Sequence, residues 1–84
     1  MLIIDTPILY PHKRKKYCHL LSDDLNELHQ FAAALNIKRG WFEKSSSGVP
    51  HYDLNEVQWR AAIDAGAIEV THRGLVTFMK KYYL

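Results

Sequence analysis

The stretch YCHLLSDDLNELHQFAAALNIKRGWF, residues 17–42, contains the clearest structural signals of the chain. Its first five residues, Tyr17–Leu21, predict a strand. In a strand Cys18 and Leu20 lie on one face, and Tyr17, His19 and Leu21 lie on the other. Apolar residues then recur at steps of three and four, which predicts a helix with one apolar face. The residues of that face are Leu25, Leu28, Ala32 and Leu35. Ser22 is the predicted N-cap, and Asn36 is expected to end the helix in the left-handed conformation.

Two more helices and further strands are predicted outside this stretch. Asp53 and Glu56 have the spacing of a capping box, so a second helix is expected from Asp53 to about Ala65, ended by Gly66. Thr71 is expected to cap a third helix, whose apolar positions are Leu75, Phe78, Met79 and Tyr82. The strands predicted outside the stretch are Leu2–Ile4 and Ala67–Val70. Within it, the segment Ile37–Phe42 is predicted as a further strand after the helix.

These elements indicate an α/β fold, with α+β as the alternative. We expect residues 1–84 to form one compact domain, in which a small sheet of three to four strands packs with three helices. Because a chain of 84 residues buries a modest core while its helices have broad apolar faces, we also expect a homo-oligomer.

Composition narrows the classes of function. A hydrophobic fraction of 48% argues against disorder, and a net charge of +2 is too small to indicate nucleic-acid binding by itself. The single cysteine, Cys18, excludes an internal disulfide and a multi-cysteine zinc site. No apolar run approaches the roughly 20 residues of a membrane span, and no secretion signal is visible. We therefore expect a cytoplasmic protein with no membrane partner.

Cations stand next to aromatic residues at two places, which predicts an anionic ligand. The run HKRKK, residues 12–16, lies between two tyrosines, and Lys38 and Arg39 precede an aromatic pair. The first hypothesis is a protein that binds a phosphorylated small molecule or nucleotide without a cofactor. Its predicted contacts are Lys38, Arg39, His51, Tyr52 and His19. A nucleic acid is a weaker alternative partner, and both basic segments could equally be solvated loops.

Histidine and aspartate residues support an alternative hypothesis, a metal-dependent phosphoester hydrolase. The predicted ligands of a divalent ion are His19, Asp23, His29, His51 and Asp53. No close pair such as HExxH or HxH is present, and glycine-rich nucleotide loops are absent as well. Asp5 is either a turn residue or a further site residue at the end of the first strand. A third hypothesis is a protein-interaction module without a ligand, in which apolar surface around Trp59 binds a partner.

The segments CHLLSDDLNELHQFAAALNIKRGWF, HYDL and AGAIEV together resemble a family of small bacterial and phage proteins, domain of unknown function 4031. The resemblance covers most of the chain, although Tyr17 replaces a frequent tryptophan and the C-terminal helix matches least. It implies a bacterial or phage accessory protein, located in the host cytoplasm if phage-encoded, and it implies no activity. It also favours His19, His29, His51 and Asp53 as site residues.

Overall fold

A six-stranded mixed sheet and three helices make up the protein, in a computed structural model that describes all residues from 1 to 84. The strands are β1 (Leu2–Ile4), β2 (Ile8–Leu9), β3 (Lys16–Ser22), β4 (Phe42–Lys44), β5 (Pro50–Asn55) and β6 (Ile68–Glu69). The helices are α1 (Leu25–Ala34), α2 (Glu56–Asp64) and α3 (His72–Tyr82), with a short 3₁₀ helix at Arg39–Trp41. None of the helices has the length and apolar character needed to cross a bilayer.

The strand order is β4-β5-β3-β1-β6, and β2 pairs with the part of β3 that β1 does not reach. All neighbours are antiparallel except β1 and β6, which are parallel. The predicted α/β class and the three helices are confirmed, but the sheet has six strands rather than three or four. The additional ones include two-residue and three-residue strands, which are too short to show a periodic sequence pattern.

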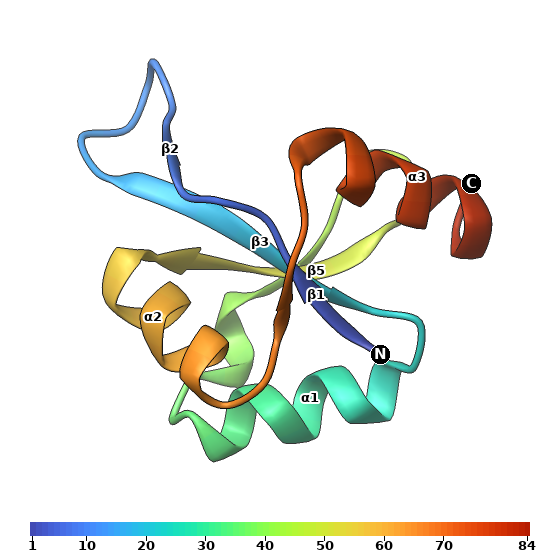
Figure 1. Ribbon diagram of the computed structural model, residues 1–84, viewed down its shortest axis with the longest axis horizontal. Coiled ribbons are helices and arrows are strands. Elements are labelled where there is room, and N and C mark those ends of the chain that lie inside the picture. Colours follow the sequence, from blue (N-terminus) through green and yellow to red (C-terminus); the bar gives the residue numbers. More distant parts are fainter.

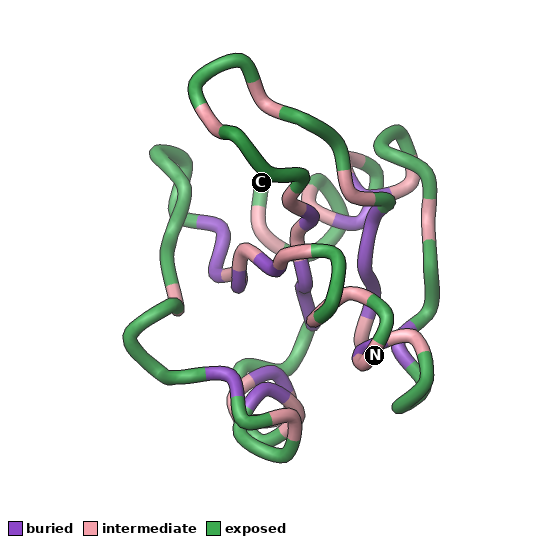
Figure 2. The backbone as a smooth tube through the Cα atoms, turned by 90° about the vertical axis from the view of Figure 1, so that its left-hand side faces the viewer, coloured by how far each residue is buried: buried purple, intermediate pink, exposed green.

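Helices cover both faces of the sheet, with α1 and α2 on one side and α3 on the other (Figure 1). Leu20, Tyr52 and Leu54 point from the sheet into the larger hydrophobic cluster, together with residues of α1 and α2. Ile3 and Leu21 point to the opposite side, where they pack with residues of α3. Buried segments accordingly lie in the interior of the backbone trace and exposed turns lie around it (Figure 2).

Helix α1 begins two residues later than predicted. Its N-cap is Asp24, whose side chain accepts a hydrogen bond from the Glu27 backbone N–H. Ser22 remains in β3, where its hydroxyl accepts from the Asp24 N–H at 3.0 Å and donates to Glu27 at 2.7 Å. The predicted end of the helix is confirmed, since Asn36 has a φ of 59°.

The predicted helix cap at Asp53 is wrong, because residues 50–55 form the strand β5. The N-cap of α2 is Asn55, which makes a reciprocal capping box with Gln58. Burial alternates strictly along β5, as expected for a strand with one fully buried face and one partly open face. The cap at Thr71 is confirmed, because its hydroxyl accepts from the Gly74 N–H at 3.0 Å.

Candidate metal centre

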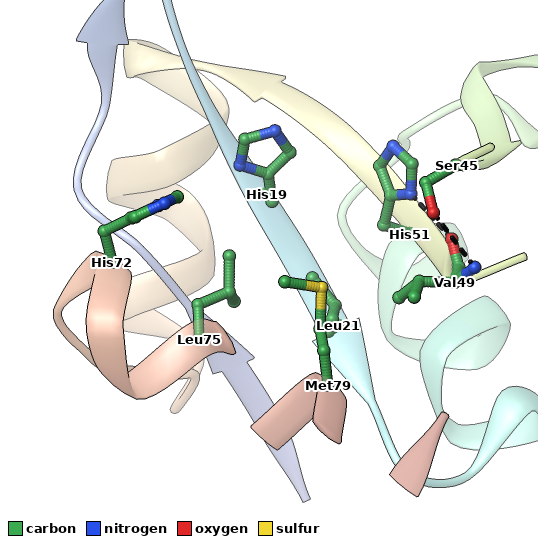
Figure 3. A pocket seen from close by; sticks show the side chains of 8 residues that line it. All are labelled: His19, Leu21, Ser45, Val49, His51, His72, Leu75 and Met79. Carbon is green, nitrogen blue, oxygen red and sulfur yellow. Dashed lines mark hydrogen bonds between the residues drawn. The ribbon is translucent and has the colours of Figure 1, made fainter. Parts of the chain in front are cut away.

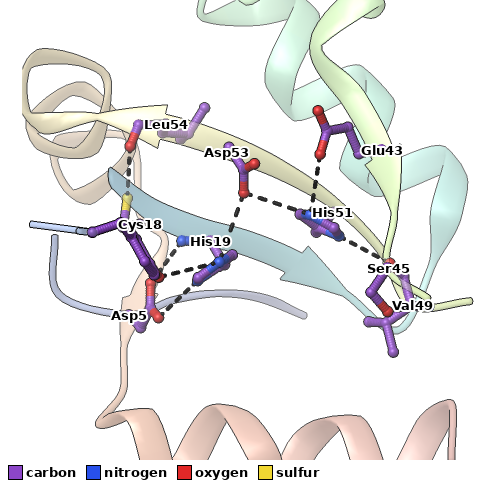
Figure 4. A network of polar contacts seen from close by, with 10 residues as sticks. Asp5, Cys18, His19, Glu43, Ser45, Val49, His51, Asp53 and Leu54 are labelled. Carbon is purple, nitrogen blue, oxygen red and sulfur yellow. Dashed lines mark hydrogen bonds and ion pairs between the residues drawn. The ribbon is translucent and has the colours of Figure 1, made fainter. Parts of the chain in front are cut away.

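Polar side chains form a row across the sheet, on the face that α3 partly covers. The β3–β5 pairing places His19 opposite Asp53, and the β4–β5 pairing places Glu43 opposite His51. Directly opposed residues of an antiparallel pair have Cβ atoms about 4.5–5.5 Å apart, so their side chains meet. Asp5 follows β1 and joins the row beside His19 (Figure 4). Strand register, rather than any loop, therefore builds this cluster.

The ring of His19 is held by Asp5, which is only 4% exposed. One carboxylate oxygen accepts from the backbone N–H of His19 at 2.6 Å, and the other lies 3.0 Å from Nδ1. This second bond places the proton on Nδ1 and leaves the lone pair on Nε2, which is the arrangement found in carboxylate–histidine–metal sites. The same bond raises the pKa of His19, against the opposing effect of burial.

The ring of His51 is oriented in the same way by a backbone group. Its Nδ1 lies 2.9 Å from the carbonyl oxygen of Val49, which can only accept, so Nδ1 carries the proton. The Nε2 atom then has its lone pair free. It lies 3.5 Å from Asp53 Oδ1 and 3.9 Å from Glu43 Oε2. Both histidines thus present Nε2 to carboxylates with the tautomer that a metal ion requires.

The spacing of these atoms fits a divalent cation. The ligand atoms of Glu43, His51 and Asp53 all lie within 4.8 Å of one another, and His19 Nε2 lies 3.7 Å from Asp53 Oδ1. Ligands about 2.1 Å from a tetrahedral ion lie about 3.4 Å apart. The three histidine–carboxylate separations, 3.5, 3.7 and 3.9 Å, are within about half an ångström of that value. Imidazole nitrogens with carboxylate oxygens suit Zn²⁺, Mn²⁺ or Fe²⁺.

A basic and aromatic surface adjoins the cluster. A hollow of about 120 Å³ extends from His19 and Asp53 to Lys13 in the exposed β2–β3 loop, which projects from the body of the molecule (Figure 1). The Lys13 Nζ stands 4.4 Å from the centroid of the Tyr17 ring. A second hollow of about 230 Å³ lies between Lys13, Tyr17 and Trp41 and reaches Asp53. A cation and two aromatic rings therefore lie beside the candidate centre.

Of the five predicted metal ligands, the structure brings together His19, His51 and Asp53. Asp23 lies at the edge of the molecule, where its carboxylate accepts from the α-amino group of Met1 at 2.7 Å. His29 belongs to α1, on the opposite side of the sheet, and its Nδ1 lies 2.8 Å from the Tyr52 hydroxyl. These two residues cannot share an ion with the other three, because the sheet separates His29 from them and Asp23 is already bound elsewhere.

The predicted anion-binding set does not converge either. Tyr52 is 1% exposed and points toward α1, while its neighbours His51 and Asp53 point to the other face. Lys38 and Arg39 are exposed at the 3₁₀ helix, where the Arg39 guanidinium lies 5.8 Å from the Phe42 ring centroid. The two-residue period of β5 separates Tyr52 from His51 and Asp53, because adjacent residues of a strand point to opposite faces.

Sequence reasoning missed Glu43 altogether and left Asp5 undecided. Glu43 reaches His51 because the serine-rich segment after β4 is a hairpin turn, closed by a bond from the Ser45 N–H to the Val49 carbonyl at 3.1 Å. A usable signal was present in the sequence. Apolar and polar residues alternate in residues 50–55, directly after a turn that contains Gly48, and this pattern is typical of the second strand of a hairpin.

Comparison with known proteins gives one match. The family described as Protein of unknown function (DUF4031) matches residues 2–82. No curated protein and no solved structure matches the chain.

Proposed function

Since the chain belongs to the DUF4031 family, whose description names no activity, we propose a function from its geometry: the protein binds a divalent metal ion and hydrolyses a phosphoester. The ion would be held by His19, His51, Asp53 and Glu43. The observation that carries the proposal is that two histidines, each fixed through Nδ1, direct Nε2 at the same carboxylate oxygen, Asp53 Oδ1.

The charge balance of the row supports a cation. Glu43 and Asp53 bring two carboxylates to within 4.8 Å of each other and of a His51 nitrogen, and Lys13 lines the hollow beside them. Like charges at this distance repel each other, and the repulsion is stronger near a partly buried surface than in water. A divalent ion removes this repulsion, and the open side of the sheet leaves room for water or substrate beside it.

A phosphoester is the substrate class that the surroundings favour. Lys13 supplies a positive charge next to the row, and further cations of the β2–β3 loop are exposed around it. A divalent ion polarises a phosphoryl oxygen and lowers the pKa of a bound water. Hydrolysis then adds water across the ester bond. The water oxygen bonds to phosphorus, the P–O bond to the alcohol breaks, and the alcohol oxygen takes the proton that the water loses. No oxidant or further co-reactant is needed.

Binding of a phosphorylated ligand without turnover is the second candidate. The hollow between Lys13, Tyr17 and Trp41 favours it, because a cation beside aromatic rings suits a phosphate attached to a planar group. The same surface would serve a hydrolase, so the two candidates differ in turnover and not in where the phosphate lies.

Metal binding is tested by thermal unfolding with Zn²⁺ and Mn²⁺. An ion at 100 times its Kd stabilises by about 2.7 kcal/mol, which for a domain of this size raises Tm by roughly 10 °C or more. We expect His51→Ala to abolish the rise. His29→Ala is the matched control, because it removes a histidine outside the row and should keep the metal-induced rise.

Turnover is tested on p-nitrophenyl phosphate and its diester, with chelator added and metal then restored. Metal-dependent release of p-nitrophenol that Asp53→Asn abolishes is the expected result. Binding of the ion and of phosphate esters with no release would favour the second candidate. No change of Tm with either ion at millimolar concentration would refute the metal centre.

A further inference from the structure

An apolar cavity of about 240 Å³ lies between the sheet and α3, directly beside the candidate metal centre (Figure 3). Leu21 and Val49 line it from the sheet side. Leu75 and Met79 project into it from α3. His19 and His51 also line it, so the two histidines that we assign to the ion face this space as well.

This cavity is open to solvent on one side, so it is a surface pocket rather than a fault in the packing of the core. Its apolar walls have fewer contacts with other protein atoms than a close-packed interior gives. An engineered apolar cavity of about 150 Å³ is large enough to take up benzene. The cavity here is larger, so one aromatic ring with a substituent, or two fused rings, would fit. Met79 stands at its wall, and its unbranched side chain can adjust to such a group.

The two sides of the candidate centre differ in character. On one side lie the apolar walls provided by Leu75 and Met79, and on the other lie Lys13 and the polar hollow around it. A substrate that spans the centre must therefore have an apolar end and an anionic end. A phosphoester of an apolar alcohol has this distribution, with the P–O bond that breaks between the two ends.

We propose that the cavity binds the organic group of the substrate, so that the substrate is a phosphoester of an aromatic or similarly apolar alcohol. The proposal rests on the proposed hydrolase function and names its substrate class. The ring lies between α3 and the sheet, and the phosphate lies at the row of His19, Asp53 and His51, oriented toward Lys13. His72 stands at the start of α3 and lines the cavity as well.

The test compares methyl phosphate with 1-naphthylmethyl phosphate on the metal-loaded protein, because the alcohols of these two esters are similar leaving groups. One methylene group in a hydrophobic pocket changes kcat/KM by about 10-fold or more, so we expect kcat/KM for the naphthylmethyl ester to exceed that for the methyl ester by at least this factor. Met79→Trp fills the cavity and should reduce this preference about tenfold or more. Tyr82→Trp is the matched control, because Tyr82 is 41% exposed on the same helix, and it should keep the wild-type preference.

A second measurement is independent of turnover. Methyl resonances of Leu21, Val49, Leu75 and Met79 are followed while 2-naphthol is added to the metal-free protein. Shifts in the wild type that Met79→Trp removes support the cavity as a ring-binding site, even if no ester is hydrolysed. Hydrolysis with equal kcat/KM for both esters, or no methyl shift at millimolar 2-naphthol, would overturn the inference and leave the hydrolase proposal standing.

Discussion

Replacing Asp5 by asparagine should keep the fold and impair the metal centre. The carboxylate of Asp5 accepts two hydrogen bonds from His19, one from the backbone N–H at 2.6 Å and one from Nδ1 at 3.0 Å. An asparagine side chain has one acceptor and one donor in the same place. If its oxygen keeps the shorter bond to the backbone, its NH₂ group faces Nδ1. The ring proton must then move to Nε2, and this nitrogen can no longer bind an ion.

The Asp5→Asn exchange should lower both metal affinity and stability, because Asp5 is buried and bonded to a histidine that we assign to the ion. Partners that orient a metal-bound histidine typically contribute 10-fold to 100-fold in metal affinity, which is about 1.4–2.7 kcal/mol. The loss of one hydrogen bond to a buried charged group should lower the free energy of unfolding by about 1.5–3 kcal/mol. Because one of the two bonds survives, we expect a protein that still folds and that loses a similar amount of free energy in zinc binding and in unfolding.

The assay is calorimetric titration with zinc at pH 7.5, combined with urea unfolding of the metal-free protein and ¹⁵N chemical shifts of the His19 ring. Asp23→Asn is the matched control: it changes a carboxylate that binds the Met1 amine and should leave zinc affinity unchanged. A folded Asp5→Asn protein with the wild-type zinc Kd would show that Asp5 only supports the fold, and the argument for an oriented His19 would fail.

Three further predictions follow from features outside the row. Burial, and next the charge of Arg39, lower the pKa of His29, so the folded state takes up a proton less readily than the unfolded chain. The free energy of unfolding therefore falls as the pH drops below 6.5. His29→Phe should reduce this fall in urea unfolding at several pH values, and an unchanged dependence of the free energy on pH would contradict it. Burial raises the pKa of Cys18 to about 12, so iodoacetamide should label the thiol only in denaturant, and rapid labelling of the folded protein would show otherwise. Val57 and Leu9 are 81% and 60% exposed, so light scattering should detect a dimer or larger species, and a monomer at high concentration would refute this.

Local signals predicted the parts of the fold that local interactions decide. The strand Leu2–Ile4, the left-handed Asn36 and the cap at Thr71 each depend on one or two residues and their immediate neighbours, and all three are confirmed. Gly66 likewise ends α2 with a φ of +106°. The errors at Ser22 and Asp53 arose where a capping pattern and an alternating strand overlap, because side chains that cap helices also occur at strand ends.

The candidate site could not be predicted in this way, because strand register assembles it. His19 faces Asp53 only when β3 pairs with β5 in the observed register, and a shift of one residue would turn these side chains to opposite faces. Neither residue type nor spacing specifies that pairing. Residue chemistry did identify His19, His51 and Asp53 as candidates, whereas Glu43 gave no signal until its strand partner was known.

Two short segments, HYD (residues 51–53 of β5) and ELH (residues 27–29 of α1), meet on one side of the sheet, while part of HYD also faces the other side. In HYD the outer two residues, His51 and Asp53, join the polar row, while Tyr52 between them is buried and its hydroxyl lies 2.8 Å from His29 of ELH. His29 also packs edge-on against Phe42, with ring centroids 4.6 Å apart. The contact between ELH and HYD therefore fixes β5 against α1. Because register sets the row on the other face, this buried contact helps to hold His51 and Asp53 in line with His19 without touching the ion.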